Sequence, residues 1–454
     1  MHMEKNLTTG SVFKNVILFS LPYLLAYFLQ TLYGMADLFI IGQFENVAGT
    51  TAVSIGSQVM HMLTVMIVGL AMGTTVSIGQ ASGAGDRKQA AKDVGNTMML
   101  FMAVSVTLMV VLLALVRPIT SAMSTPTEAM DGTVAYLTIC FIGIPFITAY
   151  NIISSIFRGM GDSKSPMYFI AVACAANISL DYLFMGILHL GAAGAALGTT
   201  LSQAISVAVS LTVILKRKSI ALKKDDFKPC RPVMGKILKI GVPIAFQDGL
   251  IQIAFIVITI IANQRGLNDA AAVGIVEKVI GFLFLIPSSM LSTVSALGAQ
   301  NIGAGKPERA IQTLRYAVLL AVGFGVISSI VIQFAAEPVV ALFTDRNTVG
   351  GADVIRLGGQ YLRGYIWDSI FAGIHFSFSG YFCACGKSGL SFLHNILAIA
   401  LVRIPGVYLT SQLFPETLFP MGLATAAGSL LSVVICVIAF TVIRRKDWQL
   451  ALRG

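Results

Sequence analysis

The sequence predicts an all-α integral membrane protein with 12 transmembrane helices in two parallel six-helix repeats. Three observations support this fold class. Charged residues make up only 11% of the 454-residue chain and hydrophobic ones 56%, so too few polar groups exist to coat a soluble protein of this size. Apolar runs of about 20 residues, the length that crosses a bilayer, recur along the whole chain. A motif in the first half also returns in the second.

The apolar runs place the elements in order. Because they are continuous and lack the period-two alternation of membrane β-barrels, helices are the way to satisfy their backbone polar groups in lipid. In the first copy we expect spans at 14–41, 50–78, 93–117, 132–157, 166–188 and 192–215. In the second copy we expect them at 239–262, 271–298, 314–343, 358–383, 389–414 and 419–443.

The repeated motif indicates an internal duplication. Residues 79–90 read GQASGAGDRKQA, and residues 299–310 read AQNIGAGKPERA, with Gln, Gly-Ala-Gly and Ala in register. Six spans per copy is an even number, so both copies enter the membrane from the same side and the repeats are parallel. A duplicated membrane protein with a site between its halves is the expected form of a secondary transporter.

Cationic residues orient the chain and divide it. Most of the 31 Lys and Arg residues lie in the termini and in the loops after even-numbered spans, which predicts that both termini are cytoplasmic. We expect an N-lobe at 1–215, a basic interlobe linker at 216–238 and a C-lobe at 239–454. A nucleic-acid or lipid-binding linker is the alternative to a solvated topology determinant, which we favour. The first span has no cleavage site for a signal peptide.

Five acids fall inside the predicted spans, where a charged side chain costs about 2.5–3.5 kcal/mol even on an insertion scale. They are Asp37, Asp181, Asp248, Glu277 and Asp368. Each therefore requires a partner or a purpose. Asp37 follows Gln30 and Tyr33 at helical spacing, so the three form one polar stripe that should face the bundle interior.

A second polar stripe occurs in the fifth span, where Asn177 and Asp181 are four residues apart. The sixth span begins with the polar residues Thr199, Thr200 and Gln203, so the stripes can converge within one lobe. Carboxyl groups can exchange protons, and carboxyl, amide and hydroxyl oxygens together suit Na⁺. We favour this functional interpretation for Asp37 and Asp181 over the alternative, that they hold helices together through hydrogen bonds.

The second copy carries a different polar set. Glu277 and Lys278 are adjacent and so point to different faces of their helix. We hypothesise an ion pair between Lys278 and Asp368, which would leave Glu277 for a proton or a cationic ligand; structural pairing is the open alternative. Asp248 lies near the cytoplasmic end of its predicted span, and Arg403 is expected to anchor helices.

The ordered motifs resemble those of the multidrug and toxic compound extrusion family. The resemblance rests on the two Gly-Ala-Gly loops, the segment FRGMGD at 157–162 and the segment VRIP at 402–405, and it covers essentially the whole chain. It implies a bacterial inner-membrane antiporter with two lobes around a central cavity, which exports cationic or amphipathic compounds in exchange for H⁺ or Na⁺. No cofactor beyond that ion is implied, and a monomer should suffice.

The resemblance also implies site residues. In the branch similar to the DNA-damage-inducible transporters, the N-lobe cation site matches Asp37, Asn177, Asp181 and Thr199, with Tyr136 a looser match. The branch similar to the norfloxacin exporters uses C-lobe acids. This chain departs from that pattern, because Asp368 is displaced by about a turn and Asp248 stands near the start of its span.

Three classes of function compete. The first is a cation-coupled multidrug efflux antiporter, which we favour, with small organic molecules, the ion and membrane lipids as partners and no nucleic acid. The alternative is a flippase or exporter of a lipid-linked or specialised metabolite, which would favour a cationic cavity. An enzyme or channel lacks support, because no nucleophile with a base, HExxH motif, ATP-binding loop or filter-like motif occurs.

Overall fold

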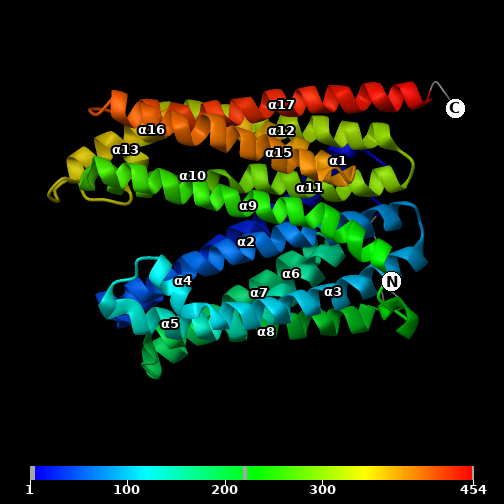
Figure 1. Ribbon diagram of the computed structural model, residues 1–454, viewed down its shortest axis with the longest axis horizontal. Coiled ribbons are helices and arrows are strands. Elements are labelled where there is room, and N and C mark those ends of the chain that lie inside the picture. Colours follow the sequence, from blue (N-terminus) through cyan, green and yellow to red (C-terminus); the bar gives the residue numbers. More distant parts are fainter. Residues whose placement is uncertain (1–5, 218–221, 452–454) are drawn as a thin grey trace. The chain divides into compact units, whose positions relative to one another are not determined.

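The computed structural model describes residues 6–217 and 222–451, and these residues form helices and no strand. Residues 1–5 of the predicted N-lobe, 218–221 of the predicted linker and 452–454 of the predicted C-lobe lie outside the described residues. Ten helices or helix pairs in the described part are long and apolar enough to span a membrane, or eleven if a bent pair is counted as one span. Figure 1 shows the helices of each unit running side by side.

The first half of the chain contains helices α1 to α8, a π turn η1 and a short 3₁₀ helix η2. Their bounds are α1 Val12–Phe44, α2 Val47–Gly83, α3 Arg87–Ala114, α4 Val116–Ala122, α5 Thr127–Ile142, α6 Ile144–Gly159, α7 Lys164–Asp181, η1 Tyr182–Ile187, α8 Gly191–Arg217 and η2 Lys224–Phe227.

The second half contains helices α9 to α17 and a second π turn, η3. Their bounds are α9 Arg231–Arg265, α10 Leu267–Leu283, α11 Leu285–Gly303, α12 Pro307–Ala341, α13 Gly351–Tyr365, α14 Asp368–Ala384, α15 Ser388–Ala398, η3 Ile399–Arg403, α16 Ile404–Leu413 and α17 Phe419–Ala451.

Several predicted spans are broken helices. The fourth consists of α5 and α6, which meet at a 48° bend at Gly143, two residues before Pro145. Proline lacks the backbone N–H that would continue the helical hydrogen bonds. The eleventh contains η3 just before Pro405. The tenth, 358–383, is divided between α13 and α14. That pair carries Arg363 and Asp368 and is not among the eleven strongly apolar spans.

The chain folds into two compact units. The first comprises the described residues up to Ala245 together with Ala299–Lys306, and the second comprises Phe246–Gly298 and the described residues from Pro307 onward. The boundary therefore falls inside α9, and the repeated motif near residue 300 groups with the first unit. The predicted division at 216–238 was based on the polar, basic linker segment, whereas these units are defined by which residues pack against one another.

The two copies of the repeated motif adopt the same helix-ending turn. Gly85 and Gly305 have φ values of +71° and +69°, in the left-handed region that glycine tolerates best. In each turn the next N–H donates back across the helix end, from Asp86 to the Ala81 carbonyl (3.0 Å) and from Lys306 to the Asn301 carbonyl (2.8 Å). Each helix ends at the first glycine of its Gly-Ala-Gly, and the third glycine is the left-handed residue of the turn that follows.

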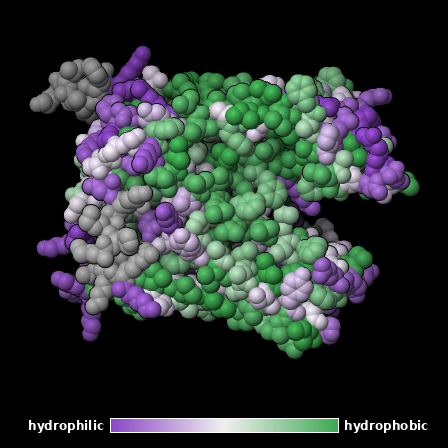
Figure 2. Space-filling model, turned by 180° about the vertical axis from the view of Figure 1, so that it is seen from behind, coloured by the Kyte–Doolittle hydropathy of each residue, from purple (hydrophilic) through white to green (hydrophobic). Residues whose placement is uncertain are grey.

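The outer surface of each unit is apolar. On the face shown in Figure 2, hydrophobic side chains cover the middle of each unit and hydrophilic ones gather at its two ends. Exposed hydrophobic residues include Phe39 and Met102 in the first unit and Ile327 and Phe334 in the second, with relative exposures between 62% and 83%. Side chains of this kind would be costly in water and are suited to contact with lipid.

Candidate functional site

The predicted stripe on α1 contains a buried carboxylate. Asp37 is 3% exposed, although it lies on a helix whose other faces carry exposed Leu and Phe side chains. Tyr33, one turn earlier, is half-buried and reaches the same neighbouring helix as Asp37. Gln30 is also half-buried, but no hydrogen bond joins it to Asp37 in the described part of the chain.

Helix α8 holds Asp37 and Tyr33 of α1 through hydrogen bonds. The Thr199 hydroxyl donates to Oδ2 of Asp37 at 3.1 Å. The Tyr33 hydroxyl donates to the backbone carbonyl of Thr199 at 3.2 Å and lies 3.2 Å from the Ser202 hydroxyl. Sequence reasoning missed Ser202, although it follows Thr199 by one helical turn. These contacts tie α1 to α8 at the level of the carboxylate.

Helix α7 brings the second stripe to the same place. Asn177 and Asp181 are wholly buried, and both lie close enough to Asp37 to interact with its carboxyl group electrostatically. Gly198 of α8 packs so closely on Asp181 that a Cβ there would overlap Oδ1 of the carboxylate. Asp181 ends α7 and is followed directly by the π turn η1; such irregular turns are frequent at functional sites.

Tyr136 of α5 completes this cluster. It is 2% exposed, lies near Asp37 and Tyr33, and packs its ring on Gly56 of α2, where a Cβ would overlap the ring. The structure thus brings Asp37, Asn177, Asp181, Thr199 and Tyr136 together from four helices. We refer to these five residues as the N-lobe cluster.

The N-lobe cluster leaves several polar atoms without partners. Within the described residues, no hydrogen bond reaches Oδ1 of Asp37, either carboxylate oxygen of Asp181, or the amide of Asn177. No Lys or Arg pairs with either acid in the same residues. Two neighbouring carboxylates in an apolar bundle need positive charge between them, and carboxyl, amide and hydroxyl oxygens suit a proton or a hard cation such as Na⁺.

The C-lobe polar residues are dispersed. Glu277 accepts a hydrogen bond from the Thr259 hydroxyl of α9, at 3.2 Å and 3.4 Å to its two oxygens. Asp248 is half-buried near the middle of α9. It is not at the helix end, as its place in the predicted span suggested, because α9 begins earlier, at Arg231.

The hypothesis that Lys278 pairs with Asp368 is wrong. Asp368 is fully buried and pairs with Arg403, whose Nη2 lies 2.9 Å from Oδ2 of the carboxylate. Lys278 is exposed. The reason is helical geometry: Lys278 lies next to Glu277 and so points away from the face that Glu277 presents to Thr259. Arg403 was expected to anchor helices, but the sequence did not indicate its partner.

The chain has relatives among known proteins. A family model described as MatE matches residues 22–183 and 243–409. The chain is similar to the Probable multidrug resistance protein YpnP of Bacillus subtilis, with 27% identity over 97% of each chain. It is also similar to the Multidrug export protein MepA of Staphylococcus haemolyticus, with 26% identity over 90% of this chain and 89% of that protein.

Solved structures share the fold. A structure titled as the outward-facing conformation of a multidrug resistance MATE family transporter superposes with a TM-score of 0.90. It is 20% identical in sequence, over 98% of this chain and 100% of that one. Another, a transporter of the MOP superfamily from Pyrococcus furiosus described as having a binding pocket of reverse polarity, has a TM-score of 0.88 at 21% identity over 98% of each chain.

Proposed function

This chain belongs to the MatE family, and we propose on that basis that it is a secondary multidrug efflux antiporter, which exports cationic or amphipathic organic compounds in exchange for H⁺ or Na⁺. The family's relatives are named for multidrug resistance and export. No step of this function requires an enzyme active site. Small organic molecules are the substrates and an inorganic cation is the coupling partner.

The observation that supports ion coupling most directly is the N-lobe cluster. Its two carboxylates lie together in an apolar bundle and carry unpartnered oxygen atoms. A bound proton or Na⁺ would relieve the charge repulsion and satisfy those oxygens. Because Asp37 is held by Thr199 of α8 and lies near residues of α7, a change in its charge would change the contacts among three helices.

Coupling follows from that link between charge and packing. In the ion-loaded state α1, α7 and α8 hold one arrangement, and release of the ion exposes two uncompensated carboxylates that favour another. An ion can drive such a change only to the extent that it binds the two arrangements with different affinity. The N-lobe cluster supplies that difference in affinity. Its unpartnered oxygens bind the cation strongly in the arrangement that buries them together and weakly in one that separates them.

Several finer features belong to the same proposal. We place the protein nearer the branch that resembles the DNA-damage-inducible transporters, because Asp37 and Asp181 lie together in the N-lobe, whereas the C-lobe acids are dispersed. We place it in the bacterial inner membrane, surrounded by lipid, as a monomer with cytoplasmic termini and with no resident cofactor. In the C-lobe, Asp248 and Glu277 are the half-buried acids available for a cationic substrate.

The experiment that tests this function is ethidium transport in proteoliposomes with a pH gradient or a Na⁺ gradient imposed separately. Wild type should follow one gradient. Asp37→Asn and Asp181→Asn, which keep shape but remove charge, should lose that dependence. Glu337→Gln, which removes a partly exposed acid of α12, is the matched control and should transport like wild type.

Two results would contradict the proposal. Gradient-driven transport that survives both substitutions would exclude the N-lobe cluster as the coupling site. Wild-type transport that ignores both gradients would favour the flippase or metabolite exporter.

A further inference from the structure

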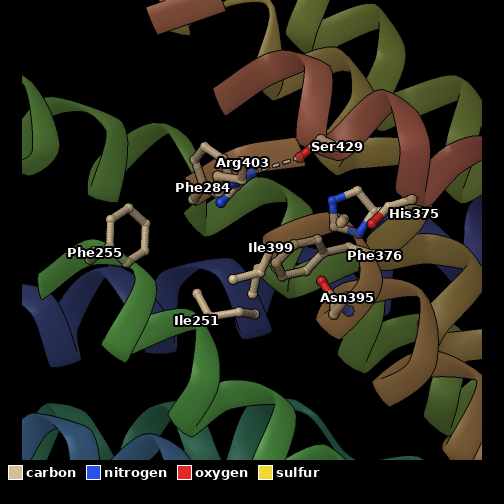
Figure 3. A pocket seen from close by; sticks show the side chains of 11 residues that line it. Ile251, Phe255, Phe284, His375, Phe376, Asn395, Ile399, Arg403 and Ser429 are labelled. Carbon is tan, nitrogen blue, oxygen red and sulfur yellow. Dashed lines mark hydrogen bonds between the residues drawn. The ribbon is translucent and has the colours of Figure 1, made fainter. Parts of the chain in front are cut away.

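The cavity inside the second unit is too small for an organic ligand. Figure 3 shows the side chains that line it, among them Phe255, Phe376, His375 and Arg403. Its volume is about 40 Å³, and one water needs about 10–15 Å³, so it has room for about three waters. Arg403 on its wall already pairs with Asp368. Neither the size of the cavity nor its charge therefore favours an organic ion.

One face of α3 in the first unit changes from basic to apolar along the helix. Residues three or four positions apart lie on the same side of a helix. This spacing aligns one stripe of α3 residues: Lys88, Lys92, Gly95, Met99 and Met102. Lys88 is exposed, and Met99 and Met102 are 44% and 62% exposed. Because α3 is long and apolar enough to span a membrane, the two methionines are placed to contact acyl chains.

The linker between α8 and α9 packs on this stripe at Gly95. A Cβ at Gly95 would overlap the backbone carbonyl of Asp226 in η2. The neighbouring Asn96, which is fully buried, donates from its side-chain amide to the same carbonyl at 3.2 Å. It also accepts a hydrogen bond from the Cys230 backbone N–H at 2.6 Å. The described part of the linker, residues 222–230, is therefore docked on α3 between the basic and the apolar end of the stripe.

The docked linker presents cationic side chains that are not neutralised by the protein. Lys223, Lys224 and Arg231 are exposed, and no carboxylate among the described residues forms an ion pair with them. Lys228 is 78% exposed and pairs only with Asp225, which is 79% exposed. An ion pair so open to water is weak. We refer to Lys223, Lys224, Lys228 and Arg231 as the basic patch, and it retains charge for an external anion.

The basic patch and the two methionines together match the two ends of a phospholipid. A dissolved anion would use the cations and leave the apolar surface of Met99 and Met102 uncovered. A lipid without net charge would cover the methionines and leave the cations without a partner. Each Lys or Arg near an anionic membrane surface strengthens binding by a factor of about five. Sequence alone favoured a solvated linker, whereas its docking one turn from Met99 favours a lipid ligand.

We propose that this surface is a binding site for an anionic phospholipid of the surrounding bilayer. The headgroup phosphate lies on the basic patch, and the acyl chains run along α3 over Met99 and Met102. The site is separate from the N-lobe cluster. It does not rest on the proposed efflux function and would exist even if ion coupling occurred elsewhere.

The test is lipid titration of the full-length, detergent-purified protein, followed by native mass spectrometry. The probe is palmitoyl-oleoyl phosphatidylglycerol, and phosphatidylcholine with the same acyl chains is the matched lipid without net charge. We expect the first phosphatidylglycerol to bind at least tenfold more tightly than phosphatidylcholine. An increase from about 0.1 M to about 1 M ammonium acetate should weaken this preference, because the Debye length falls from about 10 Å to about 3 Å.

A triple variant tests the basic patch. Lys223→Gln, Lys224→Gln and Lys228→Gln together remove three exposed charges, so they should leave the fold intact and lower the preference for phosphatidylglycerol at least tenfold. A control variant removes as many exposed cations from the second unit: Arg346→Gln, Arg356→Gln and Lys387→Gln. It should bind phosphatidylglycerol like wild type.

Two further variants separate a built site from exposed charge. Asn96→Ala keeps every charge but removes the hydrogen bonds that dock the linker, so the preference for phosphatidylglycerol should fall. Met102→Gln changes a side chain that is already 62% exposed and should weaken the binding of both lipids. Thermal unfolding of each variant identifies any loss that comes from misfolding.

Four results would overturn the proposal. These are equal affinity for the two lipids, an unchanged preference in the linker triple variant, an equal loss in the control variant, and an unchanged preference in a folded Asn96→Ala protein. A short thymidine oligonucleotide that binds the patch as tightly as phosphatidylglycerol would assign it to nucleic acid instead. Ethidium transport is measured separately, so failure of this site and failure of the efflux function are distinguishable.

Discussion

Asp368 and Arg403 form a buried ion pair across 35 residues of sequence, with 2.9 Å between Oδ2 and Nη2. The pair joins the first residue of α14 to the last residue of η3 and is completed by the Ser429 hydroxyl of α17. Three elements of the second unit therefore meet at one guanidinium. Each of the two buried charges is compensated only by the other.

This relationship predicts an uneven effect of substitution on stability. Removal of one partner leaves a buried, uncompensated charge and should cost about 3–5 kcal/mol. Arg403→Gln should therefore lower the thermal unfolding midpoint of the detergent-purified protein strongly. The double variant with Asp368→Asn should recover much of that loss, because no lone charge remains. Equal destabilisation by the single and double variants would show that the pair is not the stabilising feature.

Close backbone packing at the repeated motif gives a second prediction. A Cβ at Gly83 would overlap the carbonyl oxygen of Gln300, and a Cβ at Gly303 would overlap that of Gln80. Gly83→Ala or Gly303→Ala should therefore destabilise the protein by about 1–3 kcal/mol through overpacking. The matched control is Gly281→Ala, where no atom lies within 4 Å of the added Cβ. That change should stabilise α10 slightly. Thermal unfolding measures all three.

The hydroxyl of Thr199 should matter for transport. It donates to Asp37 at 3.1 Å, and a hydrogen bond to a charged group contributes about 1.5–3 kcal/mol. Thr199→Val keeps the shape and removes the donor, so the initial rate of gradient-driven ethidium transport should fall about tenfold or more at a fixed gradient. Thr199→Ser keeps the donor and should stay near wild type. Similar rates in Val and Ser variants would show that this hydrogen bond is not used.

Asn96 should control access to the linker. Its side-chain amide donates to the Asp226 carbonyl at 3.2 Å, and its Oδ1 accepts from the Cys230 backbone N–H at 2.6 Å. Asn96→Ala removes both bonds, so trypsin should cleave after Lys224 of the linker several-fold faster in the intact protein. Thr107→Ala, an exposed change on the same helix, should leave the cleavage rate unchanged. Unaltered cleavage in Asn96→Ala would mean that other contacts hold the linker.

Cys230 provides a pH-dependent test outside the membrane spans. A hydrogen bond from the backbone N–H of Val233 lowers the pKa of the Cys230 thiol, and nearby Lys92 lowers it further. A lower pKa means more thiolate at neutral pH, so alkylation by N-ethylmaleimide should reach half its maximal rate below the ordinary pKa of about 8.5. Cys385→Ser, used as the background, removes the other half-buried thiol. A midpoint at or above 8.5 would contradict the assignment.

Much of the fold could be read from local sequence. The length of each apolar run predicts a helix regardless of its neighbours, because lipid forces every backbone group into internal hydrogen bonds. The helix breaks needed more. A proline such as Pro145 permits a bend, but whether α5 and α6 bend or run straight depends on the packing around Gly143. The Gly-Ala-Gly repeats revealed the duplication, yet their first glycines have a role that only packing shows.

The candidate sites divide in the same way. Spacing placed Asn177 and Asp181 on one helix face, and the high cost of an acid in lipid singled out Asp37. Sequence could not choose among distant partners, and it paired Lys278 with Asp368 where the structure pairs Arg403. The contact between Arg403 and Ser429, the role of Ser202 and the cavity near His375 were not predicted.

The sequence by itself determined that the chain is a duplicated, helical membrane protein with a few acids that need an explanation, because hydrophobicity and helical spacing are properties of neighbouring residues. The tertiary structure alone decided which groups meet. Thr199 reaches Asp37 across 162 residues, and Arg403 reaches Asp368 across 35. Such contacts arise from the packing of many side chains at once, since a buried charge takes whichever partner the folded bundle brings within a few ångströms.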